Sequence, residues 1–183
     1  MPSTGHASAN NTETMAALLE DFLPCEKQIT IHVDGPGSIG GFEELIRATF
    51  AGAREEDTAL IYLSTHGTAR GDKMALLMSD GEQEEGLTPE QMRQALDRVP
   101  GEKILILDAC HSGAVIGAGP DGKNWFDAGS YRVLASSGAQ EDSWFWSAEE
   151  DEYTGTGYFT EALDSALRAS DPEQIDPDGD GTV

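Results

Sequence analysis

The sequence predicts an α/β fold in three layers, with a mostly parallel central sheet and helices on both of its faces. Two apolar runs, at 58–64 and 103–107, have the composition of strands that are buried on both sides, as in the middle of a parallel sheet. Segments with helical periodicity alternate with these runs, which is typical of parallel sheets covered by helices. The chain has 183 residues, a length that fits one domain with a sizeable core.

The chain before the first buried run is mixed in character. Residues 1–14 are small and polar without periodicity, and we expect them to be disordered. Apolar residues at helical spacing then predict a helix over 15–23, which Pro24 ends. Residues 28–33 alternate as a strand, and 42–50 predicts an amphipathic helix whose large apolar residues share one face.

Between the two buried runs we expect a polar loop over 68–73, a short strand over 74–78 and a helix that begins at Thr88. Thr88 is followed by Pro and, three positions on, by Gln91, so this start has the residues of a capping box with proline at the first helical position. A Pro-Gly pair ends the helix shortly before the second buried run.

The second buried run is followed by a Gly-, Pro- and Asp-rich loop at 117–129, a strand at 131–135, an irregular acidic loop at 143–157 and a helix at 158–169. These elements predict one folded domain over 15–170. The chain then enters an acidic Asp/Gly-rich tail over 171–183, and we expect the natural protein to continue beyond it.

Composition and charge exclude several classes of protein. The chain has 34 acidic and 11 basic residues and a formal charge of −23, so nucleic-acid binding, which needs a basic face, is not expected. The charge serves solubility, attracts basic peptides, or does both. No apolar run reaches the ~20 residues of a membrane span, and the polar N-terminus lacks the apolar core of a signal peptide. Two cysteines cannot form a disulfide framework, which favours a reducing, cytoplasmic setting.

Reactive residues follow both buried runs. The first run ends in Ser-Thr-His-Gly, with His66, and the second ends in Asp-Ala-Cys-His-Ser-Gly, with Cys110 44 residues later. Because the carboxyl ends of parallel strands meet at one edge of a sheet, we expect both side chains on the same rim. A thiol needs a base or a positive neighbour to become a nucleophilic thiolate, and His66 is the candidate.

These two motifs resemble those of the caspase-like cysteine peptidases, which include caspases, metacaspases and their bacterial relatives. The resemblance covers roughly 29–168 and implies a cysteine endopeptidase that needs no cofactor. Cys110 would attack a peptide carbonyl to form a thioester, with His66 as base. The backbone N–H groups of Gly67 and Cys110 are the candidates for the oxyanion hole. The chain departs from its relatives in one respect, since no hydrophobic first strand precedes residue 15: the strand is absent, is replaced by another segment, or belongs to an earlier part of the natural protein.

An acidic specificity pocket is expected beside the nucleophile. Asp108 lies two residues before Cys110, so in extended backbone both side chains face the same way. A carboxylate there would bind a guanidinium or ammonium group, and the matching Asp in metacaspases lines the primary pocket, which implies cleavage after Arg or Lys. Ser136, Ser137 and Asp142 resemble the loop that completes this pocket in relatives. Cleavage after Asp is the alternative, although caspases carry Gln-Ala-Cys where this chain has Asp-Ala-Cys.

Other readings of the same residues stay open. A zinc site could be built from four residues near the rim, but the short ligand pairs of structural zinc sites are missing; the four are His66, Asp108, Cys110 and His111. His111 is a rival base, but its side chain is expected to point away from Cys110, in a structural or substrate-lining role. A caspase fold without catalysis, used as a binding or regulatory module, is the competing function, and a caspase-fold transpeptidase is a third reading.

Two further features concern regulation. Lys123 lies in the loop after the nucleophile and is a candidate site of processing, by the enzyme itself or by an activating protease. Asp176, Asp178 and Asp180 match the first half of an EF-hand loop, so weak Ca²⁺ binding is an expectation, although the glutamate at position 12 of that loop is absent. The expected partners are a protein or peptide substrate and an activating protease or regulator.

Overall fold

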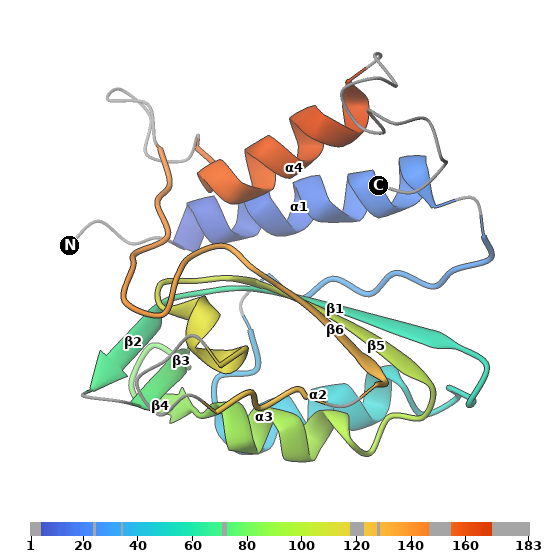
Figure 1. The fold of residues 1–183 in the computed structure, drawn as a ribbon, viewed down its shortest axis with the longest axis horizontal. Helices are drawn as coiled ribbons and strands as arrows, with labels where there is room; N and C mark the ends of the chain where they lie inside the picture. The colour runs from blue at the N-terminus through green and yellow to red at the C-terminus, as the bar shows by residue number, and fades with distance from the viewer. Residues whose placement is uncertain are drawn as a thin grey trace.

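The computed structural model describes residues 5–23, 25–33, 35–70, 73–117, 123–127, 129–146 and 155–169. Within these ranges the predicted three-layer α/β fold is confirmed: a parallel sheet of three strands has helices on both faces (Figure 1). No helix in the same ranges combines the length and the apolar character that crossing a bilayer requires.

The central sheet has the order β1-β5-β6. Its strands are β1 (Thr58–Ser64), β5 (Glu102–Asp108) and β6 (Tyr131–Ala135), and both pairings are parallel. The strand β5, which ends two residues before Cys110, is therefore the middle strand. This position explains why five of its seven residues are buried. The sheet confirms the strands predicted at 58–64, 103–107 and 131–135.

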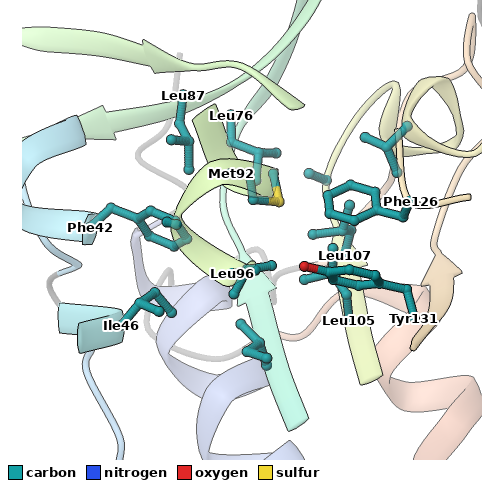
Figure 2. Close-up of a cluster of buried hydrophobic side chains, with 14 of the residues drawn as sticks. Phe42, Ile46, Leu76, Leu87, Met92, Leu96, Leu105, Leu107, Phe126 and Tyr131 are labelled. Atoms are coloured by element: carbon teal, nitrogen blue, oxygen red, sulfur yellow. The ribbon is translucent and has the colours of Figure 1, made fainter. Parts of the chain in front are cut away.

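Two pairs of helices cover the sheet (Figure 1). On one face lie α1 (Gly5–Phe22) and α4 (Tyr158–Arg168), and on the other lie α2 (Ile39–Thr49) and α3 (Pro89–Leu96). Alternate residues of β5 serve the two faces. Leu105 and Leu107 join the larger core with α2 and α3 (Figure 2), whereas Ile106 packs against the side of α1. Asp108 follows Ile106 by two and thus points to the side of α1 and α4.

A second, antiparallel sheet of order β2-β3-β4 adjoins the rim. Its strands are β2 (Gly67–Arg70), β3 (Lys73–Ser79) and β4 (Glu84–Leu87). The predicted strand at 74–78 is confirmed as β3. The loop predicted at 68–73 is wrong for 68–70 and 73, which pair as strands, whereas 71–72 lie outside the described residues, and β4 was not predicted. Both missed strands are four residues long, too short to show an alternating pattern by themselves.

The N-terminal helix is longer than predicted. It begins at Gly5, so the expectation of disorder over 1–14 is wrong for residues 5–14. Ala7, Asn11, Met15 and Leu18 are all buried and recur at helical spacing. The buried asparagine interrupts the apolar pattern, which is why the helix could be recognised only from Met15 onward.

The strand predicted at 28–33 is also wrong, because this segment has no strand partner among the described residues. Ile31 and Val33 are about half exposed. The predicted helix start at Thr88 is confirmed in detail, since the Thr88 hydroxyl accepts from the N–H of Gln91 and the Gln91 side chain accepts from the N–H of Thr88.

Candidate active site

The carboxyl ends of β1 and β5 bring the two motifs together. The strands pair in parallel and end in register, and the N–H of Thr65 donates to the carbonyl oxygen of Asp108 at 3.3 Å. A Cβ atom at Gly67 would overlap the carbonyl oxygen of Cys110, so this approach requires glycine. His66 and Cys110 therefore belong to two segments in direct backbone contact on one rim of the sheet.

The second sheet holds the loop that carries His66. The N–H of Leu77 in β3 donates to the carbonyl oxygen of His66 at 2.8 Å, and the Thr65 hydroxyl donates to the carbonyl oxygen of Leu77 at 2.9 Å. The side chain of His66 is exposed. The imidazole is thus attached to a fixed backbone and can be reached from solvent.

Residues 109–113, called the nucleophile turn because Cys110 is the candidate nucleophile, lead from β5 into a short 3₁₀ helix at Ser112–Val115. His111 has a φ of +62° and is the one non-glycine residue with positive φ among those described. Such left-handed residues are uncommon and occur at sharp turns and functional sites. The N–H of His111 donates to the carbonyl oxygen of Glu141 at 2.8 Å, which ties the turn to the loop after β6.

The two serines after β6 also hold the nucleophile turn. Ser137 and Ser112 each accept, through the hydroxyl oxygen, the backbone N–H of the other at 3.2 Å. The Ser137 hydroxyl donates to the carbonyl oxygen of Ala109 at 3.0 Å. The Ser136 hydroxyl accepts the N–H of Ala109 at 3.1 Å and lies 2.9 Å from the Ser143 hydroxyl. Ser136 thus contacts both the turn and Ser143, whereas the hydrogen bonds described for Ser137 are with the turn.

Asp108 is a buried carboxylate surrounded by neutral donors. Its exposed fraction is 6%. Oδ2 accepts from the Thr160 hydroxyl at 2.8 Å, the Asn11 amide at 3.1 Å and the Tyr62 hydroxyl at 3.4 Å. Oδ1 accepts from the Ser143 hydroxyl at 2.9 Å. None of the ion pairs among the described side chains includes this carboxylate.

Asn11 was not predicted to be near the site. It is 4% exposed, and its amide nitrogen donates to both Asp108 and the Ser64 hydroxyl, each at 3.1 Å. Its amide oxygen accepts the N–H of Gly157 at 2.6 Å. A Cβ atom at Gly157 would come within 2.8 Å of Asp108 Oδ2, so the chain before α4 packs directly against the carboxylate.

Ser143 contacts both Cys110 and the buried carboxylate of Asp108. Its N–H donates to Cys110 Sγ at 3.3 Å, and the thiol donates to its carbonyl oxygen at 3.6 Å. Its hydroxyl donates to Asp108 as described above. The loop after β6 therefore covers the space between Cys110 and Asp108, a contact that the sequence did not indicate.

The surroundings of Cys110 favour the neutral thiol. Burial raises the pKa of Cys110 above its ordinary value, and the carboxylate of Asp142 raises it further, while the N–H of Ser143 opposes both. Asp142 is exposed, and its Oδ1 lies 3.7 Å from Nε2 of His111. The buried Nδ1 of His111 has no hydrogen-bond partner among the residues that the structure describes. Asp142 therefore lies beside Cys110 and His111, and none of its described contacts is with Asp108.

Of the predicted regulatory residues, Lys123 is described by the structure. Lys123 is exposed, and its ammonium group lies 3.3 Å from the centre of the Trp125 ring. Asp176, Asp178 and Asp180 fall outside the described residues. In the part of the chain that is described, no group of three or more His, Cys, Asp or Glu side chains is arranged to hold a metal ion. This holds for the four residues considered as zinc ligands.

Comparison with known proteins agrees with this architecture. No curated protein sequence matches the chain closely enough to serve as a relative. The family model described as "Caspase domain" matches residues 3–176, which is nearly the whole chain. The chain therefore belongs to the caspase-domain family of cysteine peptidases.

Proposed function

We propose that the protein is a cysteine endopeptidase that cleaves after Arg or Lys, with Cys110 as nucleophile and His66 as base. The observation that carries this proposal is the buried carboxylate of Asp108, whose hydrogen-bond donors among the described residues are all neutral. Ser143 contacts both this carboxylate and the Cys110 thiol. Cytoplasmic location and independence from a cofactor are parts of the same proposal.

The charge of Asp108 favours a basic substrate. Buried charges are normally paired or bind a metal, because removing an ion from water is costly. Hydroxyl and amide donors satisfy the lone pairs of this carboxylate but leave its charge uncompensated. A guanidinium or ammonium group from a substrate would supply the opposite charge in a largely dry pocket, where it is worth more than in water.

The chemistry follows from the two segments on the rim. His66 takes the thiol proton of Cys110, and the thiolate attacks the carbonyl carbon after the basic residue. The N–H groups of Gly67 and Cys110 are proposed to stabilise the oxyanion. The peptide C–N bond breaks, the leaving amine takes a proton from His66, and water then hydrolyses the thioester to release the acid and the thiol.

The remaining pocket residues have distinct proposed roles. Ser136 lies next to Ser143 and belongs to the wall of the Asp108 pocket. Ser137 and Asp142 lie on the side of the nucleophile, where Asp142 can meet the substrate near the scissile bond.

Activation by processing at Lys123 is proposed as well. Its side chain is exposed, as a processing site must be. A Lys123→Ala chain that stays intact on activation is the expected result, and unchanged processing would contradict it. Ca²⁺ binding through Asp176, Asp178 and Asp180 is a proposal that the same assays address by adding and omitting the ion.

Hydrolysis of fluorogenic peptides ending in Arg, Lys, Asp or Asn tests the function. We expect turnover of the Arg and Lys peptides that is lost in Cys110→Ala and in His66→Ala. Cys25→Ala, which removes an exposed cysteine elsewhere on the molecule, is the matched control and should keep full activity. Turnover of Asp peptides alone would contradict the role of Asp108. If the processed chain hydrolyses none of the four peptides, a binding module is favoured.

A further inference from the structure

We propose that Ser143 is a specificity-determining residue, because its hydroxyl occupies the place on Asp108 that a basic substrate side chain must take. This inference rests on the proposed function. A residue before the cleaved bond must place its carbonyl carbon at Cys110 Sγ and its cation at Asp108. Ser143 already reaches both, with its backbone at the thiol, 3.3 Å and 3.6 Å away, and its hydroxyl at Asp108 Oδ1, 2.9 Å away.

The two oxygens of Asp108 are held by different kinds of structure. The three donors to Oδ2 come from α1, β1 and α4, which are packed elements. The donor to Oδ1 comes from the loop after β6. A cation therefore meets Asp108 at Oδ1, and the bond that it replaces is the one from Ser143.

The Ser143 hydroxyl has a second partner in place. The hydroxyl of Ser136 donates to it at 2.9 Å. The flanking backbone is anchored on both sides, since Glu141 accepts the N–H of His111 and the N–H of Trp146 donates to Thr156. A rotation of the Ser143 side chain removes its hydrogen bond to Oδ1, and the Ser136 hydroxyl can then donate to the carbonyl oxygen of Ala109, 3.3 Å away.

This arrangement makes the Ser143 hydroxyl a filter. A basic side chain compensates for the lost hydrogen bond by pairing with the carboxylate, but a neutral side chain offers nothing in return. Removing the hydroxyl should thus strengthen the binding of a guanidinium group and, at the same time, lower the stability of the free protein. Truncating a residue with a purely structural role would instead weaken guanidinium binding and lower the stability of the free protein.

The proposed role of Ser143 is tested by measuring the binding of a basic ligand to a variant that cannot turn over substrate. In a Cys110→Ala background, Nα-acetyl-arginine methylamide is titrated and followed by tryptophan fluorescence, since Trp144 neighbours Ser143. We expect Ser143→Ala to bind this probe about 10-fold more tightly than the background, equivalent to ~1.4 kcal/mol. Without the probe, the thermal unfolding midpoint of Ser143→Ala should be lower than that of the Cys110→Ala background. Ser143→Thr, which keeps the hydroxyl, should bind like the background. So should Ser79→Ala, at the end of β3, where the serine hydroxyl accepts the N–H of Gly81.

Equal or weaker binding by Ser143→Ala, or no binding by any variant, would overturn the filter. The proposed peptidase is judged separately by turnover with Cys110 intact. If that chain hydrolyses no peptide and the probe still binds in the expected order, Ser143 keeps its role and the peptidase activity is refuted.

Discussion

Replacing Asp108 by Asn separates the charge of the pocket from its shape. The two side chains have the same outline, and an asparagine can place its oxygen toward the three donors that surround Oδ2, from Asn11, Tyr62 and Thr160. Its amide nitrogen would then donate to the Ser143 hydroxyl, which accepts as well as donates. We therefore expect Asp108→Asn to fold with an unchanged or slightly higher thermal midpoint, because a buried charge without a partner disappears.

The same replacement should abolish the preference for basic residues. Removing one member of a buried charge pair costs 2–5 kcal/mol, and a central loss of about 3 kcal/mol corresponds to roughly 150-fold in kcat/KM. Arg and Lys peptides are compared with a neutral Gln peptide, whose kcat/KM should change by less than about 3-fold. A variant that is well folded and still prefers Arg would refute the role of the Asp108 charge, and a large loss of stability would refute the account of its neutral donors.

Four smaller changes test other parts of the structure. Gly67→Ala forces the backbone away from Cys110 and should lower kcat/KM for Arg peptides about 100-fold; full activity would contradict the contact. Asn11→Ala leaves buried partners unpaired and should lower the free energy of unfolding in urea by about 2 kcal/mol, and an unchanged value would contradict this. Asp142→Asn lowers the pKa of Cys110, so the midpoint of its reaction with iodoacetamide should move to lower pH, not higher. Thr88→Ala loses the capping box and should lower stability by about 1 kcal/mol with unchanged peptide turnover.

The elements that could be predicted are those whose pattern is complete within one segment. The runs that form β1 and β5 are largely uninterrupted and apolar, and Thr88 and Gln91 have the residue types and spacing of the capping box of α3. The β2 and β4 strands could not be predicted, because their four-residue lengths depend on pairing with β3. Segment 28–33 has the alternation of a strand but no partner among the described residues, and alternation alone does not supply one.

The candidate site was predictable only in part, for a related reason. Motifs at two strand ends place His66 and Cys110 on one rim, because parallel pairing fixes that geometry. Asn11 and Ser143 are single polar residues without a motif, and they reach the site through tertiary packing. A signal for Asn11 existed, since it lies at helical spacing before Met15 and Leu18, where a polar residue on an apolar face indicates a buried hydrogen-bonding role.

The amide of Asn11 has a consequence for biosynthesis. It joins α1 to Asp108 and to Gly157, which lies 146 residues further along the chain, just before α4. A growing chain on the ribosome therefore cannot complete the surroundings of Asp108 until α4 has been made. For the proposed peptidase this order acts as a safeguard, because chains that end before α4 lack the helix that holds the buried carboxylate in place.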